Sequence, residues 1–307
     1  MRAYVMGLSV VASLVACKGG SAHGGDAEPD RYAPQTSPTS STPVNATPLP
    51  PERVLEYVNR DHLPAYEGPT GSIQGTVVVT GDPSPETKNR DYSKCPRGAE
   101  AYRKLFREGP ARADGARPVA DALVAVTGYA GGYLPEQRPA RVVAIDDCVL
   151  SSRTIDMTIG QRLDFKNLMK DKIFAPAFIQ TPSVLGLVAP PAGDPVSLYP
   201  QAPGALTLFD RFGAGSAYLS AEVYVLVQPL HAVSDLEGHY RIDGIPLGDV
   251  KVNARLGVIN QQTTLPAKIR ANAVETLDLT LTYKASAVPL FTSSPVVDGG
   301  RPRTILK

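Results

Sequence analysis

Residues able to hold a metal ion are few in this chain and lie far apart. Among its 307 residues are four histidines and three cysteines. They are Cys17, His23, His62, Cys95, Cys148, His231 and His239. No histidine or cysteine lies between Cys148 and His231, and no His-x-x-Glu pair occurs. Because zinc and copper sites need several imidazole or thiolate ligands close together, the sequence predicts no metal site and no cofactor.

Two short stretches could serve acid–base catalysis. Asp146 and Asp147 are adjacent carboxylates, and Asp61 is followed directly by His62. The chain contains no Gly-x-Ser-x-Gly element and no phosphate-binding loop that could work with them. A solvated turn and a helix end explain these pairs more simply than catalysis does. We therefore predict that the protein is not an enzyme.

Composition favours a β-rich protein without a nucleic-acid partner. The formal charge is +1 at pH 7, which leaves no basic surface of the kind that phosphate neutralisation requires. Apolar residues make up 43%, enough for an ordinary core, and 29 prolines and 27 glycines separate short Val/Ile/Thr/Tyr segments. We expect an all-β fold with one or two short helices.

The N-terminus carries an export pattern. A short apolar run over residues 4–16 ends in LVAC, residues 14–17, which resembles the lipobox of bacterial lipoproteins. The resemblance implies a signal peptide over 1–16, diacylation of Cys17 and a partner in the membrane through that anchor. A plain secretory signal and a buried strand are the alternatives. Lys18 stands where Asp would indicate inner-membrane retention, so we expect the cell envelope, at the outer membrane, facing the periplasm or the cell surface.

Segments of low apolar content flank the predicted body. Residues 17–51 are rich in Pro, Ser and Thr, which predicts a disordered tether. Residues 52–70 are expected to hold a short helix and a connector, and residues 284–307 a flexible C-terminal tail. The Pro- and Gly-rich stretch Thr181–Gly204 predicts a long loop across one end of the fold.

Helical periodicity is confined to two stretches. Residues 51–60 begin with Pro and place Val54, Leu55 and Val58 on one apolar face, which predicts a short helix that docks on the body. Residues 93–110 place Tyr102, Leu105 and Phe106 on one helical face and end in Gly-Pro, a helix stop.

Alternating apolar residues predict strands through the rest of the chain. The expected strands are 73–79, 122–129, 140–148, 153–159, 162–167, 205–212, 222–227, 263–271 and 275–283. Their spacing and turn residues are typical of β-sandwiches.

The last strands carry a further pattern. The run DLEGHYRIDGIPLGDVKV, residues 235–252, resembles the carboxypeptidase regulatory-like module, a small prealbumin-like β-sandwich. The resemblance implies such a module over 229–283. It implies almost nothing about function, because this fold serves many functions.

Elements upstream of that module suggest a second family. They are GSIQGTV at 71–77, Cys95, Cys148, GQRLDFKN at 160–167 and AVSD at 232–235. Their order resembles bacterial secreted proteins that pair a cupredoxin-like domain with the regulatory-like module. The resemblance implies a cupredoxin-like β-sandwich over 71–228.

The same resemblance implies that the copper ligands have been lost. In copper-binding members a His-x-x-His segment and a Cys-x-x-His-x-x-Met segment hold the metal. The matching positions here are Lys172, Ala175, Gly213, Ser216 and Leu219, and Gln228 stands where the junction often has His. We therefore predict that this domain does not bind copper.

The remaining cysteines form a pair once Cys17 is lipidated. In an oxidising compartment two such cysteines favour a disulfide over a ligand set. We expect a Cys95–Cys148 disulfide that ties the helical segment to the sandwich.

Two functions remain open at this point. The first is a non-enzymatic cell-envelope lipoprotein with a binding or structural role, whose partner is an envelope protein or a polysaccharide. The second is a carbohydrate-binding protein, since prealbumin-like sandwiches include starch-binding relatives. Exposed rings of Tyr129, Tyr133 or Tyr199 could stack on sugars, although tyrosine fits a β core equally well and the chain has no tryptophan.

Overall fold

The computed structural model describes residues 46–285, apart from 89–91, 94, 180–186 and 213–219. This part of the chain is built mainly from strands, with two α-helices in the described residues and a 3₁₀ turn over Gly257–Ile259. The expected all-β class with short helices is confirmed. The strands form two β-sandwiches, and the second is inserted in sequence into the first.

The first, which we call the split sandwich, combines strands from both ends of the described chain. One sheet has the order β13-β1-β16, with β17 and β2 also paired to β1, and the other has the order β12-β3-β14-β15. The strands are β1 Thr70–Gly81, β2 Arg117–Pro118, β3 Leu123–Thr127, β12 His231–Val233, β13 His239–Pro246, β14 Gly248–Leu256, β15 Gln261–Ile269, β16 Val274–Thr276 and β17 Leu279–Tyr283. The 3₁₀ turn Gly257–Ile259 separates β14 from β15.

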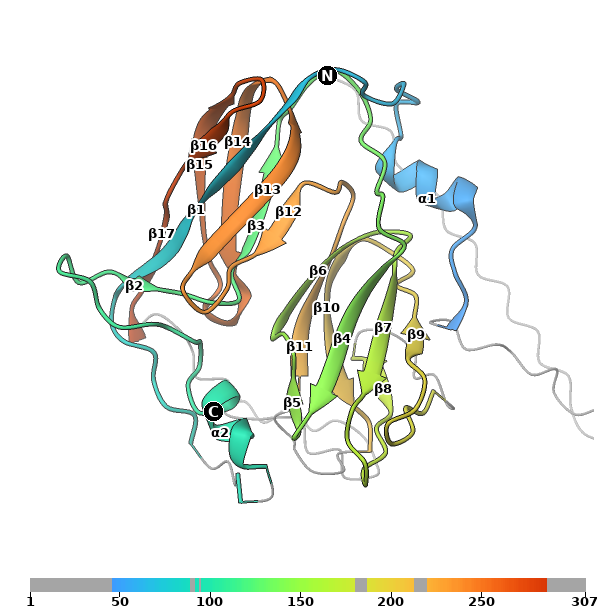
Figure 1. The fold of residues 1–307 in the computed structure, drawn as a ribbon, viewed down its shortest axis with the longest axis vertical. Helices are drawn as coiled ribbons and strands as arrows, with labels where there is room; N and C mark the ends of the chain where they lie inside the picture. The colour runs from blue at the N-terminus through green and yellow to red at the C-terminus, as the bar shows by residue number, and fades with distance from the viewer. Residues whose placement is uncertain (1–45, 89–91, 94, 180–186, 213–219, 286–307) are drawn as a thin grey trace, which may run out of the picture. The chain divides into compact units, whose positions relative to one another are not determined.

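Strand β1 holds the first of these sheets together. It pairs antiparallel with β13, with Ile73 opposite Ile242, and parallel with β17, with Val79 opposite Leu281. Figure 1 shows β1 among the orange and red strands of the C-terminal region. Ile73, Val77 and Val79 are fully buried, because alternate side chains of a strand face the same core.

The strand pairing differs from the expected division of the chain at residues 228 and 229. The sequence predicts one sandwich over 71–228 and another over 229–283. Instead, β1 and β3 complete the sheets of the C-terminal module. Among the described strands, β13 pairs only with β1, so the module needs the distant strand to bury that edge.

The second, which we call the inserted sandwich, is continuous over 140–226. Its sheets have the orders β6-β11-β10-β8 and β5-β4-β7-β9. The strands are β4 Ala140–Asp146, β5 Val149–Leu150, β6 Thr154–Thr158, β7 Arg162–Asn167, β8 Pro176–Phe178, β9 Val196–Leu198, β10 Gly204–Asp210 and β11 Ser220–Leu226. Its core is separate from that of the split sandwich and includes Phe165 and Phe174, whose ring centroids are 6.3 Å apart.

Part of the expected loop Thr181–Gly204 is a strand. Residues 181–186 lie outside the described residues, but β9 pairs antiparallel with β7, with Leu198 opposite Leu163. Both side chains are buried. The short apolar run around Leu198 therefore extends a sheet, although the surrounding prolines and glycines indicate a loop.

The first expected helix is confirmed, and Val58 of its expected apolar face packs on the body, whereas Leu55 does not. Helix α1 covers Pro51–Val58. Tyr57 and Val58 pack against the core of the inserted sandwich, whereas Leu55 is 45% exposed. Val54 lies over Gly160. A Cβ added to Gly160 would stand 2.8 Å from the Val54 side chain.

The second expected helix is shorter than 93–110. Helix α2 covers Pro96–Tyr102. Beyond it the backbone bonds to a different segment, since Leu105 N donates to Pro85 O at 2.9 Å and Phe106 N donates to the Ser84 hydroxyl at 2.9 Å. Phe106 then packs edge-on against Tyr283 in the core of the split sandwich. These tertiary contacts outweigh the local helical preference.

Candidate functional site

The chain crosses between the two sandwiches twice. Residues 128–139 connect β3 to β4, and residues 227–230 connect β11 to β12. A groove of about 320 Å³ is lined by parts of both crossings and by the end of α1 with the turn that follows it. We call it the joint groove. Ligand sites commonly form at such boundaries between folded units.

The joint groove combines aromatic rings with polar side chains. The aromatic and polar side chains in its lining include Asn59, Arg60, Asp61, Tyr129, Tyr133 and Gln228. Burial raises the pKa of the Tyr129 phenol and that of the Tyr133 phenol above the ordinary value. Both hydroxyl groups therefore stay protonated at neutral pH and can donate hydrogen bonds.

Backbone contacts fix the loop that presents Tyr133. Tyr66 N donates to Tyr133 O at 2.8 Å, and Tyr133 N donates to Pro64 O at 2.9 Å. The approach is close, because a Cβ on Gly132 would stand 2.9 Å from Pro64 O. Gly132 also has φ +146°, a conformation that favours glycine. Glycine at this position therefore lets the loop approach the 64–66 segment.

Another part of the lining is a turn held by one side chain. The amide of Asn59 donates to Leu63 O at 2.9 Å, and its oxygen accepts from Leu63 N at 2.8 Å. His62 adopts φ +52° within the turn, and its N–H donates to Asn59 O at 3.1 Å. This reciprocal bonding sets the positions of the residues between Asn59 and Leu63.

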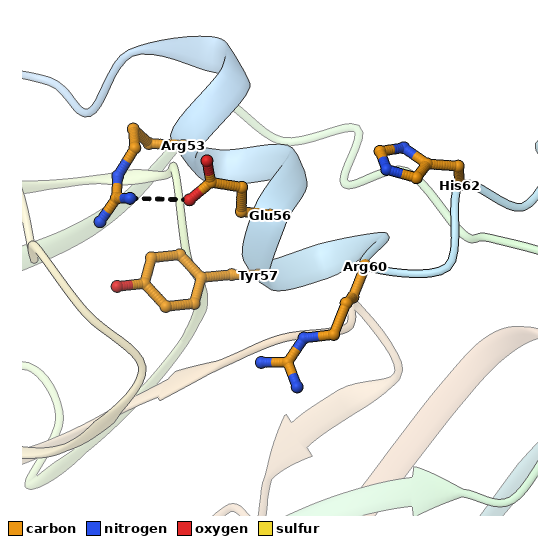
Figure 2. Close-up of a pocket in the computed structure, with 5 residues that line it drawn as sticks. All are labelled: Arg53, Glu56, Tyr57, Arg60 and His62. Carbon is orange, nitrogen blue, oxygen red and sulfur yellow. Dashed lines mark hydrogen bonds and ion pairs between the residues drawn. The ribbon is translucent and has the colours of Figure 1, made fainter.

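A second pocket, which we call the helix pocket, adjoins the same turn. It measures about 330 Å³ and is lined by Arg53, Glu56, Tyr57, Arg60 and His62. Figure 2 shows Arg53 paired with Glu56, at 2.7 Å, and the Arg60 guanidinium lying apart from that pair. Arg60 lines both the helix pocket and the joint groove. The two hollows therefore share a cationic side chain.

The structure brings together only some of the residues selected from the sequence. Tyr129 and Tyr133 line the joint groove, whereas Tyr199 does not. Of the pair considered for acid–base chemistry, Asp61 lines the joint groove and His62 lines the helix pocket.

The other acidic pair has a structural role. The Arg97 guanidinium donates to Asp146 at 3.0 Å, and Arg97 N donates to the Asp147 carboxylate at 3.4 Å. Both acidic residues thus contact the beginning of α2. This agrees with the simpler explanation of the pair as part of a turn.

Sequence reasoning missed a buried polar network around His231. The His231 side chain is fully buried, and its Nδ1 lies 2.7 Å from Oδ2 of Asp156. Arg141 forms a second ion pair with Asp156. Burial alone would raise the pKa of Asp156, but the hydrogen bond from His231 and the charges of His231 and Arg141 hold it below the ordinary value. Asp156 is the one sign of this network in the sequence, because a carboxylate within an apolar strand needs a buried partner.

The network continues through Thr158. Its hydroxyl lies 3.1 Å from Nε2 of His231 and donates to Glu136 at 2.7 Å. Asp156, His231 and Thr158 thus have the order of hydrogen bonds seen in catalytic triads. However, Thr158 is 2% exposed and its proton is directed to Glu136. A substrate could not reach this hydroxyl, so the arrangement joins β6 to β12 rather than forming an accessible reaction site.

The positions that correspond to copper ligands are only partly described. Lys172 points its ammonium at the disulfide, with Nζ 3.0 Å from Cys148 Sγ, and Ala175 is buried. Gly213, Ser216 and Leu219 lie outside the described residues. No group of three or more His, Cys, Asp or Glu residues suited to a metal ion occurs among the residues that are described.

The expected disulfide between Cys95 and Cys148 is confirmed, with the two Cα atoms 5.7 Å apart. It joins the beginning of α2 to the segment between β4 and β5. Cys17 lies outside the described residues. In the described ranges, no helix is long and apolar enough to cross a membrane.

Comparison with known proteins found only weak structural likenesses. No family model and no curated protein matches the chain. Among solved structures, a reduced variant of amicyanin matches with a TM-score of 0.25 and 16% identity, covering 28% of this chain and 81% of that one. A copper(I) form of another amicyanin variant matches with a TM-score of 0.23 and 18% identity, covering 28% of this chain and 82% of that one. These likenesses to a cupredoxin are weak.

Proposed function

We propose that this protein is a non-enzymatic lipoprotein of the bacterial cell envelope that binds a glycan in the joint groove. The observation that supports the proposal is the placement of Tyr129 and Tyr133 in one groove with amide and charged side chains. Sugar rings offer apolar C–H faces to aromatic rings and hydroxyl groups to polar side chains. A groove with both kinds of lining suits that chemistry.

The fixed walls of the groove favour binding. Asn59 holds one wall through its bonds to Leu63, and the backbone bonds of Tyr133 hold the other. Side chains and loops that are ordered before binding lose less entropy when a ligand arrives. The groove is therefore suited to recognise a ligand without a large rearrangement.

A lipid anchor at Cys17 would keep this groove at the envelope. The segment 17–51 would act as the tether, and the inserted sandwich would have a structural role without copper. A Cys17→Ser variant tests the anchor. We expect the variant to be unprocessed or released from membranes, and unchanged detergent partitioning would contradict the anchor.

Glycan binding is tested with the full chain in detergent on an array of envelope polysaccharides. We expect binding that Tyr133→Ala weakens about tenfold through the loss of ring stacking. Tyr199→Ala is the matched control, because it removes the same side chain from outside the groove and should leave binding unchanged. Equal loss in both variants, or no binding to any polysaccharide, would refute the proposal.

A further inference from the structure

We infer that the glycan carries an anionic substituent, a carboxylate or a phosphate, which is bound by Arg60 at the boundary of the joint groove and the helix pocket. This inference rests on the proposed glycan binding and narrows the class of ligand. Its structural basis is that Arg60 lines both hollows. A ligand ring on Tyr133 could therefore extend a charged group toward the guanidinium.

The charges in the helix pocket favour an anion. Arg53 and Glu56 neutralise each other in an ion pair whose side chains are both more than half exposed. Arg60 takes part in none of the ion pairs formed by the described residues. The pocket has two arginines and one glutamate, so the arginines exceed the carboxylates by one positive charge. A guanidinium is suited to this role because it binds carboxylate and phosphate oxygens through paired N–H donors.

The turn holds Arg60 and His62 in position for a ligand. Arg60 and His62 lie between Asn59 and Leu63, whose reciprocal hydrogen bonds hold the backbone in place. The φ of +52° at His62 is unusual for a residue with a side chain, and it places the ring at the helix pocket. Such conformations persist where the surrounding structure enforces them and are enriched at ligand sites.

The Asp61 carboxylate would repel an anionic group. It lines the joint groove but not the helix pocket. The anionic group is therefore expected on the helix-pocket side of Arg60, where no carboxylate other than the paired Glu56 lines the wall. Asp61 would accept hydrogen bonds from sugar hydroxyls in the joint groove.

The test compares matched acidic and neutral glycans with the full chain in detergent. One pair is an oligogalacturonate and its carboxyl-reduced form, and the other is a phosphomannan and its dephosphorylated form. We expect the acidic member of at least one pair to bind about tenfold more tightly. The preference should shrink as salt is added. Arg60→Gln should abolish it, whereas Lys268→Gln, an exposed change on β15, should not.

The outcomes separate this inference from the function on which it rests. Equal binding of acidic and neutral members, or an acidic preference that survives Arg60→Gln, overturns the inference while glycan binding stands. If Tyr133→Ala weakens binding and Arg60→Gln removes only the acidic preference, both are supported. Failure of all four glycans and of the wider array refutes the glycan function, and the inference fails with it.

Discussion

Nδ1 of His231 lies 2.7 Å from Oδ2 of Asp156, and this contact joins β12 of the split sandwich to β6 of the inserted sandwich. The two residues come from strands with separate apolar cores. Arg141 and Thr158 complete the network around them. A polar network that is buried and satisfied in this way fixes a unique arrangement of the groups that it joins.

Removing the carboxylate should destabilise the fold. In Asp156→Asn, the buried His231 ring and the partly exposed Arg141 guanidinium lose the anion that they contact. We expect the free energy of unfolding to fall by about 3 kcal/mol, the range for breaking a buried ion pair. Urea denaturation measures the change. Asp146→Asn removes an exposed ion pair with Arg97 and is the control, with an expected change below about 1 kcal/mol.

The Asp156 carboxylate should make the free energy of unfolding depend on pH in the acidic range. The pKa of Asp156 in the folded protein lies below the ordinary value of 3.8. Because the pKa is lower in the folded protein, the unfolded chain binds the proton at a higher pH than the folded chain does. The contribution of Asp156 to stability is therefore fully present above about pH 4 and is lost as the pH falls through the pKa of the folded protein. We expect the wild type to lose more free energy of unfolding than Asp156→Asn between pH 5 and about pH 2. Parallel curves for the two proteins would contradict this.

The disulfide should stabilise the fold by closing a loop in the unfolded chain. Cys95 and Cys148 are 53 residues apart, and a loop of this length corresponds to about 4 kcal/mol in the chain-entropy model. A Cys95→Ser, Cys148→Ser double variant should lose stability of that order. Non-reducing peptide mapping of the wild type verifies the bond, and free thiols in protein purified from the envelope would contradict it.

Gly132 should be intolerant of a side chain. In Gly132→Ala, the new methyl group would meet Pro64 O at 2.9 Å and the residue would also keep a strained φ. We expect a loss of about 2 kcal/mol in the free energy of unfolding, with weaker glycan binding through displaced Tyr133. Gly128→Ala is the matched control, because its φ is +78° but nothing lies within 4 Å. It should lose only about 1 kcal/mol.

Copper should not bind in stoichiometric amounts. The two cysteines outside the N-terminal segment are joined to each other, and Lys172 brings an ammonium to 3.0 Å from one of the sulfurs. The full chain in detergent would be loaded with copper(I) and copper(II) in turn, and bound metal would be measured after excess is removed. One copper per chain with a thiolate charge-transfer band would refute this prediction.

The sequence predicted strands better than it predicted their partners. Alternation located β7 at 162–167, the same bounds as in the structure. Alternation states which side chains share a face, but it contains no information about which strand lies alongside. Ile73 therefore gave no sign that its neighbour would be Ile242. The expected boundary at 228 followed chain order, whereas the sheets pair across the insertion.

The candidate site was predictable only in its components. Tyr129 and Tyr133 were selected as possible sugar contacts, but Arg60 was not, because an isolated arginine after a short helix resembles any solvated residue. Its importance comes from its place between two hollows. The sequence likewise gives no sign that His231 is paired, since its partner Asp156 is distant in sequence.

The inserted sandwich also constrains how the chain folds. Strands β3 and β12 are direct neighbours, with Ala125 opposite His231, yet the whole insertion lies between them in sequence. Closing that ladder with an unfolded insertion would carry the entropy loss of a long loop, whereas a prefolded insertion brings the two ends together beforehand. β12 should therefore gain hydrogen-exchange protection after β4–β11 during refolding. Earlier protection of β12 would show that the ladder closes around an unfolded insertion.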